Sequence, residues 1–117
     1  MQYLCLIYSA ENAGPQPGTP EFGQYIQEYQ KFTEETQSNG VFVAGDALQP
    51  STTATTVTME NGKREVTDGP FAETKEVLGG YYLLECESID QALDYAEKIP
   101  TARHGRIEVR PVMVFDN

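Results

Sequence analysis

The side chains best suited to chemistry lie in the segment VTDGPFAETKEVLGG, which spans residues 66–80. Asp68 follows a strand-like run, and a partly buried carboxylate at a strand end can move a proton near neutral pH. The same side chain can instead accept backbone N–H bonds in a turn, in which Gly69 supplies a positive φ and Pro70 a fixed one. Asp68 is therefore a candidate catalytic residue with a competing structural role, and turn chemistry accounts for D-G-P without any substrate.

Four more side chains of this region and its following strand are candidates for binding a small molecule. Phe71 either stacks on a planar ligand or plugs the core or the mouth of a barrel. Glu73 and Lys75 either orient a substrate or belong to a solvated loop, since AETKE has the composition of one. Tyr81 is expected to pack its ring in a strand, from which its phenol can reach a pocket.

Arg110 is the last candidate for ligand binding. In RIEVRPV the charged residues Arg106, Glu108 and Arg110 alternate with apolar ones. Charges on one face of a strand must be paired, lie at an edge or line a wet cavity. Arg110 therefore either binds a carboxylate or phosphate through two hydrogen bonds or joins Glu108 in a surface or interface arrangement. His104 has a side chain suited to acid–base work, but the sequence shows no partner for it, so an exposed loop position is expected.

Composition narrows the classes of partner. The chain has 117 residues, which predicts one domain over 1–117, and its formal net charge is −10. Such an acidic surface disfavours nucleic acid and anionic lipid as partners. The first apolar stretch, residues 3–8, is too short for a signal peptide or a membrane span, so a cytoplasmic location is expected.

Metal and cofactor sites are not indicated by any motif. The sequence lacks the glycine-rich phosphate loops, the zinc-binding H-E-x-x-H and the nucleophile elbow, so we expect neither a metal nor a cofactor. Cys5 and Cys86 each lie in an apolar run, far in sequence from a second metal ligand. They are expected to be buried, reduced thiols.

Hydrophobic periodicity gives the order of the elements. Apolar or alternating runs predict strands, and apolar residues at three- and four-residue steps predict helices. We expect strands at 2–9, 41–48, 77–86 and 106–115, helices at 20–39 and 88–99, and a hairpin at 53–67.

Cap and turn residues support these boundaries. Thr19 and Pro20 suit the start of the first helix and Gly40 its end. Ser88 and Gln91 form a capping box for the second helix. The apolar stripe expected to be buried on that second helix consists of Ile89, Ala92, Leu93 and Ala96.

The hairpin has the clearest local signal. Asn61-Gly62 is the preferred pair for a two-residue type I′ turn. That turn places Glu60 opposite Lys63 and Val57 opposite Val66, so the charge pairing and the apolar face agree with it.

Strand–helix–strand, hairpin and strand–helix–strand predict an α+β, ferredoxin-like βαβ(ββ)βαβ subunit with both helices on one face of an antiparallel sheet. The first strand is apolar on both sides, so either Tyr3, Cys5 and Ile7 or the alternating Leu4, Leu6 and Tyr8 are left uncovered. Wet apolar surface costs roughly 25 cal/mol per Å². We therefore predict a homodimer in which two sheets face each other, a dimeric α+β barrel with a pocket between sheet and helices or inside the barrel.

The segments DGPFAETKE (68–76), LGGYYLLE (78–85) and IEVRPV (107–112), with GVFVAGDALQPSTTATTV upstream, resemble the DGPF branch of the YCII-related family over nearly the whole chain. The resemblance implies a ferredoxin-like subunit that dimerises into an α+β barrel. Relatives in the wider family are assigned a dehydrochlorinase-type reaction, with a histidine near the first helix paired with an aspartate. The expected first helix here, PEFGQYIQEYQKF, contains no histidine, so that dyad does not carry over.

Two functions stay open at this point. The first is an enzyme of undefined reaction with a small-molecule pocket near the DGPF loop, where Asp68 moves a proton and Arg110 or a tyrosine positions the substrate. The second is a non-catalytic module that senses a ligand or binds a partner in transcription regulation, because the resemblance implies a frequent genomic association with extracytoplasmic-function sigma factors.

Overall fold

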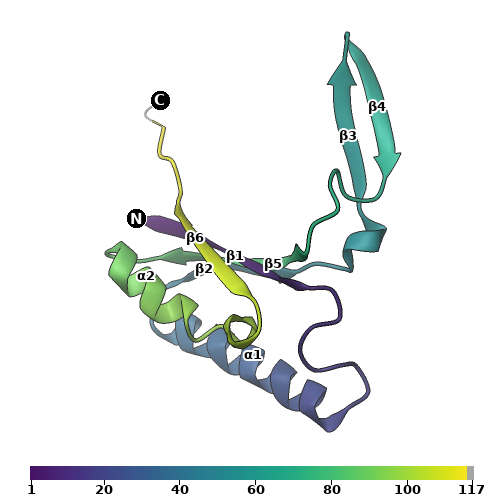
Figure 1. Cartoon of the computed structure of the whole chain (residues 1–117). Coiled ribbons are helices and arrows are strands. Elements are labelled where there is room, and N and C mark those ends of the chain that lie inside the picture. The colour runs from purple at the N-terminus through teal and green to yellow at the C-terminus, as the bar shows by residue number, and fades with distance from the viewer. Residues whose placement is uncertain (116–117) are drawn as a thin grey trace.

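The computed structural model describes residues 1–115. It has a helical layer, a sheet, and a hairpin that stands off the opposite side of the sheet (Figure 1). Within the described residues, neither helix combines the length and the apolar character that a membrane crossing requires. The elements are β1 Gln2–Ala10, α1 Pro20–Ser38, β2 Phe42–Ala47, β3 Thr55–Glu60, β4 Lys63–Asp68, β5 Glu76–Glu85, α2 Ile89–Ala96 and β6 Arg106–Pro111, with 3-10 turns η1 Ser51–Thr53 and η2 Pro100–Arg103.

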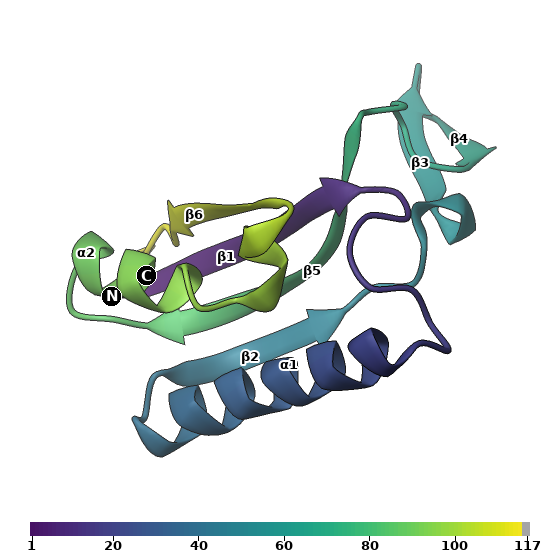
Figure 2. The same ribbon diagram turned by 60° about the horizontal axis from the view of Figure 1, so that its bottom comes forward.

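The main sheet has the predicted ferredoxin-like arrangement. Its strand order is β2-β5-β1-β6 and every neighbouring pair is antiparallel. Helix α1 runs along the β2 and β5 side, and α2 lies toward β6, so both helices cover the same face (Figures 1 and 2). The α+β fold class expected from the sequence is confirmed.

Local signals fix both helix starts. The Thr19 side chain accepts a hydrogen bond from the Phe22 N–H at 3.3 Å, and Pro20 occupies the first turn. Ser88 accepts from the Gln91 N–H at 3.2 Å, while the Gln91 side chain accepts from the Glu87 N–H at 2.8 Å. These caps satisfy N–H groups that have no partner inside the helix.

The apolar stripe expected on α2 is only half right. Ala92 and Ala96 are buried, but Ile89 is 43% and Leu93 48% exposed. The helix has only 8 residues, so a single row of small side chains reaches the sheet and the larger residues fall on its flank.

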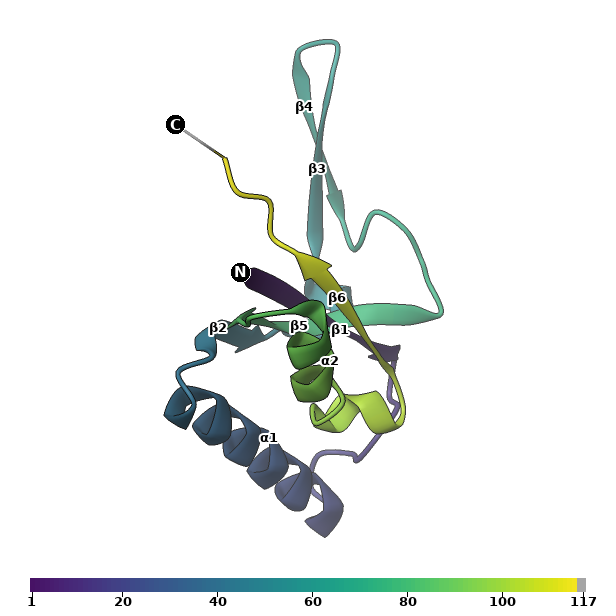
Figure 3. The same cartoon turned by 90° about the vertical axis from the view of Figure 1, so that its left-hand side faces the viewer.

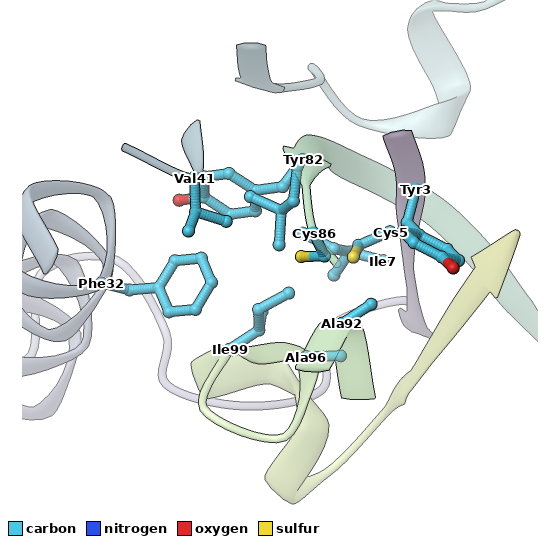
Figure 4. Packing of buried hydrophobic residues seen from close by; sticks show 11 residues of the cluster. Tyr3, Cys5, Ile7, Phe32, Val41, Tyr82, Cys86, Ala92, Ala96 and Ile99 are labelled. Carbon is cyan, nitrogen blue, oxygen red and sulfur yellow. The ribbon is translucent and has the colours of Figure 1, made fainter. Parts of the chain in front are cut away.

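The core fills the space between the sheet and the helices (Figure 4). Cys5 and Cys86 are both free and buried in it, as predicted, and burial raises the pKa of the Cys5 thiol to about 11. The buried apolar cluster consists of Tyr3, Cys5, Ile7, Phe32, Val41, Tyr82, Leu84, Cys86, Ala92, Ala96 and Ile99.

The structure shows which row of β1 side chains the helices leave uncovered. Tyr3, Cys5 and Ile7 face the helices, whereas Leu4, Leu6 and Tyr8 face away. The register places Leu4 opposite Leu83, Leu6 opposite Tyr81 and Tyr8 opposite Leu78. Neither helix covers this side (Figure 1). We call it the open face, and its apolar and aromatic residues are Leu4, Leu6, Tyr8, Leu78, Tyr81 and Leu83.

The β3–β4 hairpin pairs as predicted but does not join the main sheet. Asn61 and Gly62 have φ values of 52° and 77°, and the register joins Glu60 to Lys63 and Val57 to Val66. The two strands form a sheet of their own that projects on the side of the open face (Figure 3).

The last strand is shorter than expected. We predicted a strand to residue 115, but β6 ends at Pro111. Its partner β1 begins at Gln2, and the last backbone bond between the two segments runs from the Val112 N–H to the Gln2 carbonyl at 2.9 Å. Residues 113–115 therefore have no strand of the sheet beside them to continue the pairing.

Candidate functional site

A cavity of about 410 Å³ lies between α1 and the sheet. Its wall is built from segments that are far apart in the sequence: β1, α1, β2, β5 and the η2 turn. Hydroxyl groups and aromatic rings dominate it. We call it the tyrosine cavity, and the residues on which its chemistry depends are Tyr25, Tyr29, Thr33, Tyr82 and Thr101.

Three hydroxyls meet at one point of this wall. The buried Thr101 Oγ1 lies 2.5 Å from the Tyr25 hydroxyl and 2.5 Å from the Tyr29 hydroxyl. Three hydroxyls carry three protons, but these two contacts use only two of them. The third proton is not used by these two contacts, and the Tyr25 and Tyr29 hydroxyls are themselves close enough to bond to each other.

A second hydroxyl pair lies on the same wall. Thr33 Oγ1 bonds to the Tyr29 carbonyl at 3.1 Å, so it accepts the proton of the Tyr82 hydroxyl, which is 2.9 Å away. Burial raises the pKa of Tyr29 and that of Tyr82 because the phenolate would lose its hydration. Both phenols stay neutral at physiological pH and act as hydrogen-bond donors.

Aromatic packing holds Tyr82 in place. Its ring packs edge-on against Phe32, with centroids 4.9 Å apart, and lies nearly parallel to Tyr29, with centroids 6.5 Å apart and an angle of 12°. Gly45 lies opposite Tyr82 on β2. A Cβ atom at position 45 would lie only 2.7 Å from the Tyr82 ring, so glycine is what lets the ring lie against the strand.

The end of the cavity at η2 is tied to α1. Arg103 forms an ion pair with Glu28, next to the Thr101 contacts. His104 is exposed, as expected, yet its ring centroid lies 5.8 Å from that of Tyr25. On its other side is Gly14, where a Cβ atom would lie 2.6 Å from His104 Nε2. The only histidine of the chain thus borders the cavity's Tyr25, which the sequence did not indicate.

The tyrosine cavity offers neutral hydroxyl groups and an aromatic wall, and Asp46, whose carboxylate accepts from the Tyr81 hydroxyl, also lines it. Donors that stay protonated favour acceptor oxygens such as those of a carbonyl group. In residues 1–115 no three His, Cys, Asp or Glu side chains gather as a metal site requires.

Asp68 lies elsewhere, at the end of β4. It is exposed, is paired across the hairpin with Thr55, and lies outside the tyrosine cavity. The Gly69 N–H bonds to the Ala54 carbonyl at 2.7 Å, and Gly69 has a φ of 97°, where a side chain would be strained. Thr56 donates to the Gly69 carbonyl at 2.8 Å. The Asp-Gly-Pro sequence therefore closes the base of the hairpin. The assignment of Asp68 as a proton donor or acceptor stays a prediction.

A second hollow, of about 630 Å³, lies beneath the loop that follows. We call it the DGPF hollow; Phe71 lines it together with Tyr8 and Leu78 of the open face. Phe71 is 90% exposed and does not plug the core. Glu73 and Lys75 are exposed and form no ion pair within the described residues.

Tyr81 and Arg110 both belong to the open side of the sheet. The Tyr81 hydroxyl donates to Asp46 Oδ2 at 2.8 Å, and this bond raises the pKa of Tyr81. Tyr81 also contributes to the lining of the tyrosine cavity. Arg110 is exposed opposite Leu4, and the ion pair seen on β6 joins Arg106 to Glu76 instead, at 2.8 Å.

The structure therefore does not gather the predicted site residues into one place. Tyr81 lines the tyrosine cavity, Phe71 lines the DGPF hollow, and Arg110 lies on β6. The sequence analysis missed the hydroxyls of Tyr25, Tyr29 and Thr101. A signal was present, because two tyrosines four residues apart on the apolar stripe of a helix bring phenols that need partners when buried.

Comparisons with known proteins agree with this fold. The family model for the YCII-related domain matches residues 1–116. An uncharacterized protein of Rhizobium meliloti (strain 1021) is 34% identical over 117 residues, which cover 98% of this chain and 94% of that protein. A solved structure of the 5-chloro-2-hydroxyhydroquinone dehydrochlorinase of Burkholderia phenoliruptrix AC1100, in complex with 2,5-dihydroxybenzoquinone, is similar with a TM-score of 0.52 and 14% identity, over 97% of this chain and 94% of that one. By the family match and the identity to this relative, the chain belongs to the YCII-related family.

Proposed function

We propose that this protein is a homodimer that binds a small planar ring bearing acceptor oxygens, such as a quinone, in the tyrosine cavity. The observation that carries the proposal is the Tyr25–Thr101–Tyr29 hydroxyl cluster on the cavity wall. A carbonyl oxygen of the ligand would accept a hydrogen bond from a hydroxyl of this cluster.

The cavity suits a small ligand in size and in lining. Its 410 Å³ falls within the usual range for ligand pockets, roughly 300–1,000 Å³. The rings of Tyr29 and Tyr82 offer flat apolar surface beside the hydroxyls. A planar ring with oxygens at its edge would match both surfaces at once.

The structural neighbour supports the choice of ligand class. That enzyme was solved with 2,5-dihydroxybenzoquinone, a planar ring with carbonyl oxygens. At 14% identity its likeness extends to the fold alone, so it suggests a probe compound and no reaction for this chain.

The open face supports the homodimer. Its rows on β1 and β5 are apolar, and the helices lie on the other side of the sheet (Figure 2). A second copy that presents the same face would bury both surfaces in one isologous contact. This arrangement would leave the tyrosine cavity, on the helix side, free for a ligand.

Calorimetric titration with 2,5-dihydroxybenzoquinone tests the proposed site. Tyr29→Phe and Thr101→Val each remove one hydroxyl of the cluster, and we expect each to weaken binding about fivefold, the value of one lost neutral hydrogen bond. Phenol, a ring without a carbonyl, should bind much more weakly than the quinone.

The matched control is Tyr95→Phe. This variant also removes one phenol, but that phenol accepts from Asn39 on another part of the surface. It should leave the affinity unchanged. If the quinone does not bind, or binds equally well to the Tyr29 and Tyr95 variants, the tyrosine cavity is not its site.

A further inference from the structure

The β3–β4 hairpin has one apolar face that the chain itself leaves uncovered. Val57, Met59 and Val66 share this face with Arg64, which lies opposite Met59, and the three apolar side chains are 60%, 65% and 55% exposed. The neighbouring positions on the other face, such as Thr58 and Glu65, are polar. The alternation is that of a half-buried strand pair, yet in this subunit both faces are wet.

A two-stranded hairpin on its own is marginally stable in water. Here the pair stands away from the main sheet and the helices (Figures 1 and 3). Its turn and its cross-strand pairs are well formed, but its apolar side chains need further packing to stay ordered. Something must cover the face that holds Val57, Met59 and Val66.

Other exposed apolar groups near the hairpin indicate which molecule packs on this face. The open face lies on the side of the sheet from which the hairpin projects (Figure 1). The segment after β6 leaves toward the same side, and its Met113, Val114 and Phe115 are exposed. The DGPF hollow is lined both by residues at the base of the hairpin and by Tyr8 and Leu78 of the open face. The hairpin is thus continuous with the surface proposed to bind a second copy.

Dimensions favour an arm that reaches past the partner's sheet. Two sheets packed face to face lie about 10 Å apart, whereas six extended residues span roughly 20 Å. Strands β3 and β4 have 6 residues each. A hairpin that rises from one sheet toward the other would therefore extend along the flank of the partner.

We propose that the β3–β4 hairpin is an arm that clasps a second copy of this chain, with Val57, Met59 and Val66 packed on the partner. The inference rests on the proposed homodimer. By two-fold symmetry the arm of each copy packs on the other copy, so every apolar contact of the arm occurs twice in the dimer. The Asp-Gly-Pro turn then serves assembly, because it closes the base from which the arm projects, and the DGPF hollow is complete only in the dimer.

The test compares two charges placed on opposite faces of the arm. Met59→Glu charges the apolar face opposite Arg64, and Thr58→Lys charges the polar face opposite Glu65, so each new charge lies across from an opposite one. Sedimentation equilibrium should show the dimer dissociation constant raised at least about tenfold by Met59→Glu and by less than about threefold by Thr58→Lys. Circular dichroism checks that both variants keep the fold.

A second readout uses the absence of tryptophan from the chain. In Met59→Trp the new indole is the sole tryptophan, and its emission should shift to longer wavelength on dilution as the dimer dissociates. Emission typical of a fully wet indole at all concentrations, in a protein that is dimeric, would overturn the arm and leave the dimer standing. A wild-type protein that is monomeric would overturn the homodimer and the arm together, and equal effects of Met59→Glu and Thr58→Lys would overturn the arm alone.

Discussion

The two sides of the main sheet are built from the same strands but differ in how far their side chains are buried. On the helix side, Cys5, Leu84 and Ile99 are completely buried. On the open side, Leu78 is 36% exposed, and Leu4, Leu6 and Leu83 are only partly buried. The two sides differ in burial because the helices cover only one of them, and not because their strand sequences differ.

This contrast separates two kinds of apolar surface. The helix side closes within one subunit and holds the fold, and its polar groups are matched: within residues 1–115 no buried side-chain nitrogen or oxygen lacks a hydrogen-bond partner. In the proposed homodimer, the open side closes against another molecule. We therefore expect substitutions on the helix side to act on unfolding, and those on the open side to act on association.

The largest expected effect comes from neighbouring leucines that point to opposite sides. Leu84→Ala removes a completely buried side chain and should lower the free energy of unfolding by about 3 kcal/mol. Leu83→Ala, on the open face, should cost a dilute subunit about 1 kcal/mol or less. Urea unfolding of both variants below the dimer dissociation constant measures this difference. Equal losses would contradict the division of the sheet into two sides.

The elements on both sides could be predicted because their signals are local. The Thr19 cap, the Asn61-Gly62 turn and the pairing of Val57 with Val66 each depend on residues within a few positions of one another. The same local patterns did not reveal that Ile89 and Leu93 would be exposed. That outcome depends on how much of a short helix the sheet can reach.

The candidate site could not be predicted in the same way. The hydroxyl of Thr101 meets those of Tyr25 and Tyr29 across sequence separations of 76 and 72 residues. Such a cluster arises only when α1 and η2 pack on the same part of the sheet. The most distinctive segment of the sequence, DGPF, instead closes the hairpin, so a conspicuous motif was not a guide to the cavity.

A pH titration tests the helix side through the Cys5 thiol. Burial raises its pKa from 9.0 to about 11, so between these values the folded chain keeps a proton that the unfolded chain has lost. This contribution to stability is complete below pH 9 and declines as pH rises, by up to about 1.4 kcal/mol per pH unit.

The control for this titration is Cys5→Ala, followed by urea unfolding at several pH values. The variant should lose stability less steeply between pH 9 and 11 than the wild type. Part of the slope should remain, because burial also raises the pKa of Tyr29. An identical slope in both proteins would show that Cys5 is not protected in the folded state.

The smallest expected effect concerns a surface ion pair on the helix side. Lys98 Nζ lies 2.9 Å from Glu35 Oε1, and both side chains are well exposed. Lys98→Ala should change the free energy of unfolding by about 0.5 kcal/mol or less, because water screens such pairs. A loss comparable with that of Leu84→Ala would mean that charge pairing, rather than apolar burial, holds the helices to the sheet.

The most direct test of the account is the mass of the protein in solution at micromolar concentration. Leu6 lies in the middle of the open face, opposite Tyr81 on one side and Glu108 on the other. Sedimentation velocity should show the wild type at twice the chain mass and Leu6→Glu at the mass of a single folded chain. A wild type that stays monomeric and well folded, or a Leu6→Glu variant that dimerises as tightly as the wild type, would contradict the claim that the open face is closed by a second copy.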